Sequence, residues 1–307
     1  MNKKNKGKVS RASWLLPAFV AFGIAALAVG AVVLSANPGR QTSGSNLGER
    51  PYVGGDLHSI AVDPTDPQKV MVGGHDGGAV SEDGGKTWEQ ASGLEGADPM
   101  GWEIDPEDPE KMYAGGHSGF YRSGDGGENW EQDSSGLPGT DVHGLGMDPD
   151  DPEVLYSYVV NQGLYRSPDA GESWKLVDAN YGAMGPILVD PRNSKSLYLA
   201  GMDGGFRKSE DGGESWQKIG TIPGKMVMSS AQARKEPDTF YAAGGGVFKS
   251  ADGGESWKPA SEGLPESVSV VGVSQSDPRV VYAGALGADG VALFRSEDGG
   301  KSWRARN

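Results

Sequence analysis

The octapeptide SEDGGKTW at residues 81–88 recurs five more times along the chain, as SGDGGENW (123–130), SPDAGESW (167–174), SEDGGESW (209–216), SADGGESW (250–257) and SEDGGKSW (296–303). Successive copies begin 42, 44, 42, 41 and 46 residues apart. Repetition at a period of about 20–50 residues is typical of solenoids and propellers. The body of the chain is therefore predicted to be six copies of one structural unit.

The residues before each octet also repeat. In the first unit, HSIAVDP (58–64) is followed by a polar turn, KVMVGGH (69–75), and GGAV (77–80) leads into the octet. Short β-rich runs separated by Gly, Pro and Asp are typical of strands joined by tight turns. Four such strands per unit make an antiparallel meander, and six meanders can cover one another radially. The sequence thus predicts an all-β fold, a six-bladed β-propeller over residues 56–307 that closes without exchange of strands between the first and last units.

Each octet predicts a device that stabilises a turn. Asp and Gly suit a tight turn, and the Asp carboxylate can accept backbone N–H hydrogen bonds across it. The Trp that follows offers a large apolar surface to pack on the strands. The structural pairs are Asp83 with Trp88, Asp125 with Trp130, Asp169 with Trp174, Asp211 with Trp216, Asp252 with Trp257, and Asp298 with Trp303.

These octets resemble the Asp-box, also called the BNR repeat, of sialidases, xyloglucanases, sortilin-like receptors and photosystem II assembly factors. The resemblance covers about residues 56–307 and implies the propeller fold. It leaves the function open, because one fold hosts many functions. The whole layout is similar to that of small, membrane-anchored bacterial Asp-box proteins described as glycosylhydrolase-like.

The first 55 residues are of a different kind. A basic segment (1–13) precedes an apolar stretch (14–36), and a Gly-, Ser- and Asn-rich segment (37–55) follows as a flexible linker. About 20 apolar residues span a bilayer as a helix, and positive charge keeps its own side in the cytoplasm. We therefore expect one transmembrane helix with the N-terminus in the cytoplasm and the propeller outside. The alternative is a cleaved signal peptide and a secreted propeller.

Composition excludes several classes of function. The chain has no Cys, which removes disulfide scaffolds, thiolate catalysis and Cys-based zinc sites. Residues 1–50 hold seven of the 28 basic and one of the 42 acidic residues, which leaves 21 basic and 41 acidic residues in the body. Such an acidic body argues against nucleic acid as a partner. No cofactor is expected.

Strand direction gathers every His of the chain on one face, opposite the Asp-boxes. His58 and His143 open first strands, and His75 and His117 end second strands. Met100 and Met228 fill the slot of His58, and Met202 fills that of His75. Imidazole and thioether ligands together suit copper, although these rings can equally pack between blades. Glu103 is a lone carboxylate expected to face the central channel.

The xyloglucanase resemblance implies two catalytic aspartates in Asp-x-Gly-Gly turns. HDGG (75–78) and MDGG (202–205) supply Asp76 and Asp203, from units one and four. Inverting glycoside hydrolysis needs two carboxyl groups about 6.5–9.5 Å apart, and units one and four of a six-membered ring lie opposite each other. The family has two propellers with a groove between them, whereas this chain has one propeller with short loops.

The leading functional hypothesis is an exported, membrane-tethered module that binds or assembles a protein or a glycan on the face opposite the Asp-boxes, where loops are free to carry function. The alternatives are a glycoside hydrolase that uses Asp76 and Asp203, and metal binding by the His and Met side chains.

Overall fold

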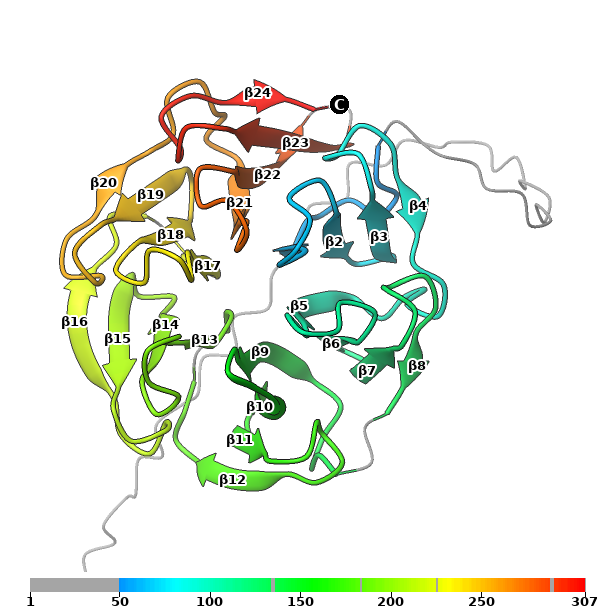
Figure 1. Ribbon diagram of the computed structural model, residues 1–307, viewed down its shortest axis with the longest axis vertical. Helices are drawn as coiled ribbons and strands as arrows, with labels where there is room; N and C mark the ends of the chain where they lie inside the picture. Colours follow the sequence, from blue (N-terminus) through cyan, green and yellow to red (C-terminus); the bar gives the residue numbers. More distant parts are fainter. Residues whose placement is uncertain (1–49, 134–135, 183, 225, 288–289, 307) are drawn as a thin grey trace, which may run out of the picture. The chain divides into compact units, whose positions relative to one another are not determined.

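The computed structural model describes residues 50–133, 136–182, 184–224, 226–287 and 290–306. These residues form six antiparallel sheets of four strands each, and every sheet is built from four consecutive strands. The sheets are arranged around a common centre like the blades of a propeller (Figure 1). The six-bladed, all-β prediction is confirmed.

The strand bounds of the first three blades are as follows. Blade one holds β1 (Ser59–Val62), β2 (Val70–Gly74), β3 (Gly77–Ser81) and β4 (Glu89–Gln90). Blade two holds β5 (Pro99–Ile104), β6 (Met112–Gly116), β7 (Gly119–Ser123) and β8 (Glu131–Gln132). Blade three holds β9 (Val142–Asp148), β10 (Asp151–Val159), β11 (Gly163–Ser167) and β12 (Lys175–Asp178).

The other three blades repeat the pattern. Blade four holds β13 (Leu188–Val189), β14 (Leu197–Ala200), β15 (Gly205–Ser209) and β16 (Gln217–Thr221). Blade five holds β17 (Ser229–Gln232), β18 (Phe240–Ala243), β19 (Val247–Ser250) and β20 (Lys258–Pro259). Blade six holds β21 (Val268–Val273), β22 (Val281–Gly287), β23 (Gly290–Ser296) and β24 (Arg304–Ala305).

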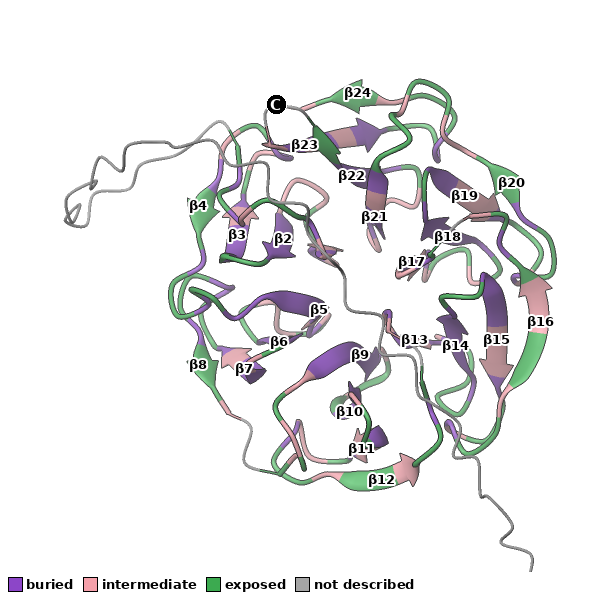
Figure 2. Cartoon of the chain, turned by 180° about the vertical axis from the view of Figure 1, so that it is seen from behind, coloured by how far each residue is buried: buried purple, intermediate pink, exposed green. Residues whose placement is uncertain are grey.

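Burial is greatest in the second strands and lowest in the fourth strands at the rim. The second strands read as continuous runs of small, aliphatic and aromatic residues, such as VMVGG in β2 and FYAA in β18, because neighbouring blades cover both of their faces. The fourth strands lie at the rim and carry the exposed residues (Figure 2). Glycine permits the close approach of blades: a Cβ on Gly73 would lie 2.5 Å from the carbonyl oxygen of Pro99 in the next blade.

The Asp-box turns have the predicted geometry. In the first turn, Oδ1 of Asp83 accepts hydrogen bonds from the backbone N–H groups of Lys86 and Thr87, and Oδ2 accepts one from the Thr87 hydroxyl at 2.7 Å. The Ser81 hydroxyl donates to Asp83 and accepts the N–H of Gly85. The carboxylates of the other five boxes make equivalent bonds. The octet is therefore a structural element in all six blades.

The tryptophans of the boxes pack inward from these turns. Trp88, Trp130 and Trp257 are buried. The indole N–H groups of Trp130, Trp216 and Trp257 donate to a glycine carbonyl three residues earlier, at 2.9–3.1 Å. These contacts tie the turn to the strand that follows it.

Blades six and one meet by side-chain packing, and among the described residues neither sheet takes a strand from the other end of the chain. Leu57 and Val53 share one buried cluster with Tyr282, Leu293 and other residues of blade six. Across the same seam, Arg306 Nε donates to the carbonyl of Gly84 at 2.8 Å. The two ends of the described chain therefore meet at one interface, as Figure 1 shows.

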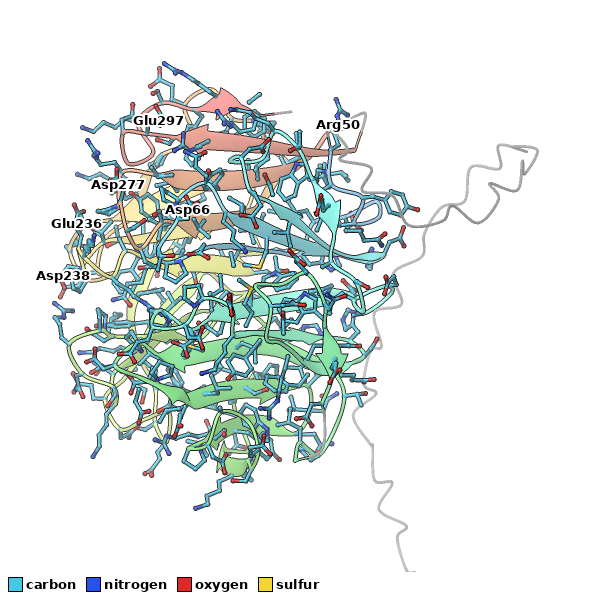
Figure 3. All side chains as sticks on the ribbon, turned by 45° about the vertical axis from the view of Figure 1, so that its right-hand side comes forward. Arg50, Asp66, Glu236, Asp238, Asp277 and Glu297 are labelled. Carbon is cyan, nitrogen blue, oxygen red and sulfur yellow. The ribbon has the colours of Figure 1, made fainter. Side chains whose placement is uncertain are left out.

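The two faces of the disc differ as strand direction predicts. Asp277, Glu236 and Asp238 lie in turns between the first and second strands of a blade, and Glu297 lies in an Asp-box. Figure 3 shows these four residues on one side of the molecule and Arg50 on the other. We call the face opposite the Asp-boxes, where second strands turn into third strands and blades connect, the histidine face.

The predicted basic segment (1–13) and transmembrane segment (14–36) lie outside the described residues, as does most of the predicted linker (37–55). Val53, near the end of that linker, is fully buried against the propeller. Within the described ranges, no helix is long and apolar enough to cross a membrane.

Candidate functional site

All four histidines lie together on the histidine face, where three adjacent blades meet. His58 comes directly before β1, His75 lies in the β2–β3 turn, His117 lies in the β6–β7 turn, and His143 belongs to β9. The rings of His58 and His75 contact each other with centroids 4.4 Å apart, and those of His117 and His143 with centroids 4.7 Å apart. Strand parity predicted the shared face, and the structure shows direct contact.

Asp98 joins the two histidine pairs. One of its carboxylate oxygens lies 2.6 Å from Nδ1 of His58 and the other lies 2.7 Å from Nδ1 of His117. Asp98 is 5% exposed and takes a left-handed backbone conformation with φ of 52°, which is uncommon for a residue other than Gly. Burial by itself would raise the pKa of Asp98, but the hydrogen bonds and charges of the two histidines outweigh it and lower that pKa. Its hydrogen bond raises the pKa of His58 against the opposing effect of burial.

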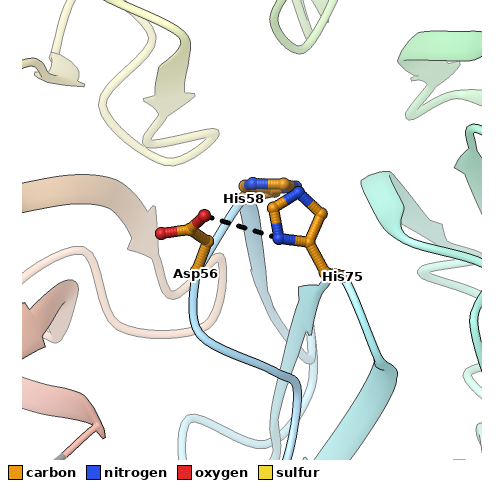
Figure 4. Close-up of side chains that lie close together, drawn as sticks. All are labelled: Asp56, His58 and His75. Atoms are coloured by element: carbon orange, nitrogen blue, oxygen red, sulfur yellow. Dashed lines mark ion pairs between the residues drawn. The ribbon is translucent and has the colours of Figure 1, made fainter. Parts of the chain in front are cut away.

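The first pair of histidines forms a triad with Asp56 (Figure 4). One donor atom from each of Asp56, His58 and His75 can be chosen so that all three lie within 4.8 Å of one another. Nδ1 of His75 is 3.4 Å from a carboxylate oxygen of Asp56, and Nε2 of His75 is 3.7 Å from Asp98. The His75 and Asp56 side chains are half exposed, so this triad opens to solvent.

The second pair forms an equivalent triad with Asp141. Nε2 of His143 lies 2.9 Å from Oδ1 of Asp141, and Nε2 of His117 lies 3.9 Å from the same oxygen. His143 is 5% exposed, and burial lowers its pKa despite the negative charge of Asp141. Nδ1 of His143 is a buried atom that makes no hydrogen bond among the described residues.

Sequence reasoning found the histidines and missed the three aspartates, although a repeat signal marks them. Asp56, Asp98 and Asp141 each stand two residues before the first-strand slot of His58, Met100 and His143, in GGDLH, GADPM and GTDVH. The same slot holds Ala183 in unit four, Met226 in unit five and Ser267 in unit six. The site is therefore confined to the first three blades.

The methionines predicted for this face are spread more widely. Met100 is buried, and Met228 is half-buried; both line the mouth of the central channel with His58. Met202 is exposed and lies in blade four beside Asp203 and Trp216. The side chains that could bind a metal and that lie in contact with one another are therefore histidines and aspartates.

Glu103 lines the central channel, where sequence parity placed it, and Arg234 of blade five lines the same channel. Burial raises the pKa of Glu103 to about 8, although the charge of Arg234 opposes this shift. Burial likewise lowers the pKa of Arg234. The channel therefore holds a carboxyl group that ionises near neutral pH.

The two aspartates predicted as catalytic have unlike surroundings. Asp76 is exposed beside His75, and its backbone N–H donates to the carbonyl of Val53 at 3.1 Å. Both carboxylate oxygens of Asp203 bind the guanidinium of Arg207, at 2.9 and 2.6 Å. This ion pair holds the pKa of Asp203 well below its usual range, so the carboxyl group has no proton to donate at neutral pH.

Comparison with known proteins establishes the fold. No protein-family profile and no curated protein matches the sequence. Among solved structures, an ancestral GH74 enzyme is 18% identical with a TM-score of 0.54, over 83% of this chain and 38% of that chain, so this chain spans well under half of that enzyme. YCF48 bound to D1 peptide is 18% identical with a TM-score of 0.51, over 87% of both chains. PorZ of Porphyromonas gingivalis is 12% identical with a TM-score of 0.52, over 81% of this chain and 32% of that chain.

Proposed function

We propose that the propeller is a binding module that holds a partner protein on its histidine face. The observation that carries this proposal is the distribution of exposed apolar side chains. Five large apolar residues are exposed among the described residues: Tyr52, Leu176, Met202, Met226 and Leu286. All except Leu176 belong to the ends of strands or the connections that form the histidine face.

The types of these residues suit protein recognition. Tyr is enriched at protein interfaces, and Met adapts its flexible side chain to varied partner surfaces. Scattered apolar residues on a surface are ordinary, whereas four of five on the face that also carries the histidines favour a docking surface. The structure of YCF48 bound to D1 peptide is a precedent for a propeller of this fold that binds a peptide.

Exchange of apolar for charged residues tests the proposal. The Met202→Glu, Met226→Glu double variant should lose a partner protein that copurifies with the full chain after chemical cross-linking in the source cells. Leu176→Glu is the matched control, because Leu176 is 52% exposed but lies on an outer strand of blade three. Loss of the partner in the control with retention in the double variant would contradict the proposal. If the ligand is a glycan instead, the wild type and Leu176→Glu should bind immobilised glycans, and the double variant should not.

We further propose that residues 14–36 anchor the chain in a membrane with the propeller on the outer side. Support comes from the sequence: five basic residues, Lys3, Lys4, Lys6, Lys8 and Arg11, precede an uncharged apolar segment. Protease added to intact cells should digest an epitope tag placed after Asn307 and leave one placed before Met1. Protection of the C-terminal tag would contradict this orientation.

A further inference from the structure

We propose that the triads Asp56–His58–His75 and His117–Asp141–His143 each bind one divalent transition-metal ion, and that Asp98 positions one histidine of each triad for this purpose. The inference does not depend on the proposed partner protein. Its support is the contacts of Asp98, the spacing of the donor atoms, and a buried nitrogen of His143 that lacks a hydrogen bond.

Asp98 selects the tautomers that metal binding requires. A carboxylate only accepts hydrogen bonds, so Nδ1 of His58, at 2.6 Å, and Nδ1 of His117, at 2.7 Å, must each carry the proton. In the neutral rings Nε2 then holds the lone pair. Metal-binding histidines usually donate their other N–H to a carboxylate or carbonyl group, which fixes the ring and strengthens the ligand. One buried carboxylate fulfils this role for both triads.

The donor atoms are spaced for shared ligation. Zn–N and Zn–O bonds are about 2.0–2.2 Å long, so two ligands on one tetrahedral ion lie roughly 3.3–3.5 Å apart. The 3.4 Å from Nδ1 of His75 to Asp56 fits this spacing, whereas the 2.9 Å from Nε2 of His143 to Asp141 is a hydrogen-bond distance that metal binding would have to lengthen. All three donors of each triad fall within 4.8 Å. Small rotations of the half-exposed His75 and His117 side chains would complete either set.

The second triad has unmet bonding capacity in its interior. Nδ1 of His143 is buried and has no hydrogen bond among the described residues, whereas Nε2 of the same ring lies 2.9 Å from Oδ1 of Asp141. A buried polar atom without a partner is costly. A cation that took Nδ1 of His143 as a ligand would give this buried nitrogen a partner.

The donor set defines the class of metal. Two imidazoles and one carboxylate with open positions suit Zn²⁺, Co²⁺, Ni²⁺ or Fe²⁺. Calcium and magnesium prefer oxygen ligands alone. The sequence suggested copper because methionine thioethers were expected among the ligands. The triads instead offer histidine nitrogens and aspartate oxygens.

Zinc titration of the full-length chain, freed of metal with a chelator, tests the inference. We expect two equivalents of Zn²⁺ by isothermal titration calorimetry, and visible absorption of tetrahedral type when Co²⁺ replaces zinc. His75→Ala should remove the first equivalent and His117→Ala the second. His75 is 50% exposed, so His75→Ala should keep the melting temperature of the wild type in the absence of metal, whereas His117→Ala also removes a hydrogen bond to buried Asp98 and should melt somewhat lower while remaining folded.

Two further variants separate positioning from ligation. Asp98→Asn keeps every ligand and should weaken both sites by about 10–100-fold. Glu95→Gln is the matched control, an exposed carboxylate between β4 and β5 on the same face, and should still bind two equivalents. The inference is overturned if zinc does not bind, if neither histidine variant changes the stoichiometry, or if a single equivalent disappears in both.

Discussion

Tyr282, in the second strand of the last blade, donates its hydroxyl proton to the carbonyl oxygen of Pro67 in the first blade, 2.8 Å away and 215 residues earlier in the chain. Tyr241 makes the same kind of bond one interface earlier, from blade five to Gly299 of blade six, at 3.2 Å. At the seam and at an interior interface alike, a second-strand tyrosine thus bonds to a backbone carbonyl of the next blade, in a first-to-second-strand turn at the seam and in an Asp-box at the interior interface.

Loss of this hydroxyl group should weaken the seam by the value of one hydrogen bond. We expect Tyr282→Phe to lower the free energy of unfolding by about 1 kcal/mol, measured by urea denaturation. Tyr241→Phe is the matched variant and should cost a similar amount. An unchanged stability in Tyr282→Phe, beside a clear loss in Tyr241→Phe, would show that the seam is not stabilised in this way.

Two glycines with similar backbone angles should tolerate alanine differently. Gly254, in an Asp-box, has φ of 92°, and Gly263, in the β20–β21 connection, has φ of 87°. A Cβ on Gly254 would lie 2.3 Å from the ring of Phe206, whereas a Cβ on Gly263 meets nothing within 4 Å. Both substitutions strain the backbone by about 1–2 kcal/mol, and Gly254→Ala should cost about 1–3 kcal/mol more through overpacking. Equal losses in urea denaturation would refute the packing argument.

The Asp-box carboxylate should make the free energy of unfolding depend on pH in the acidic range. Burial would raise the pKa of Asp83, but hydrogen bonds from Thr87, Ser81 and Lys86 outweigh it and lower that pKa to about 2. A lowered folded-state pKa adds stability above the unfolded value of 3.8, and this stability is lost as pH falls towards 2. Asp83→Asn should therefore cost about 1–3 kcal/mol at pH 7 and progressively less between pH 4 and 2.

Thermal unfolding across this pH range checks the effect. Asp66→Asn, in a turn on the same face where the carboxylate accepts the N–H of Gln68, serves as the control. It should show a smaller loss at pH 7. If the loss in Asp83→Asn is the same at every pH, the charge of the carboxylate is not its source.

Glu103 should act in the opposite direction. Its folded-state pKa is raised from 4.5 to about 8, so the folded chain holds this proton more tightly than the unfolded chain. Stability then falls as pH rises from 4.5 to 8. Glu103→Gln cannot ionise and should exceed the wild type by roughly 2–4 kcal/mol at pH 9, with no difference at pH 4. Parallel pH profiles of the two proteins would exclude Glu103 as the responsible group.

The glycosidase hypothesis has a direct test in Asp203. A general acid must hold a proton, usually through a raised pKa, yet Arg207 keeps Asp203 ionised. Asp203 is thereby excluded as the general acid of such a pair, and, because a binding module needs no hydrolysis, we expect no release of reducing sugars from xyloglucan or other polysaccharides by the full chain. Release that Asp76→Asn abolishes, while Glu95→Gln leaves it intact, would restore the hydrolase as the function.

The fold could be predicted from sequence because each blade repeats a local rule. The octet from Ser81 to Trp88 defines a hairpin turn through hydrogen bonds among its own residues. Six such units can bury their sheets by packing against one another in a ring. The face of the histidines was predictable for the same reason, since strand direction follows from the meander.

The contacts within the site were not predictable, because they cross blades. Asp98 of blade two binds His58 of blade one, 40 residues earlier, and its role depends on a left-handed backbone that brings its carboxylate between two rings. The guanidinium of Arg207 binds the carboxylate of Asp203. The Asp-Gly-Gly turn in the sequence gives no sign of this ion pair. Such details depend on how far neighbouring sheets rotate and approach, which spacing along the chain does not specify.

Closure without strand exchange also bears on how such a ring can change in evolution. Every blade is one uninterrupted segment with all four of its strands. Duplication or deletion of a single repeat would therefore add or remove a complete sheet, and no remaining strand would lose its hydrogen-bonded neighbour. The histidines and aspartates belong to blades one to three. Duplication or deletion of blade four, five or six would therefore change the diameter of the ring and leave every residue of the cluster in place.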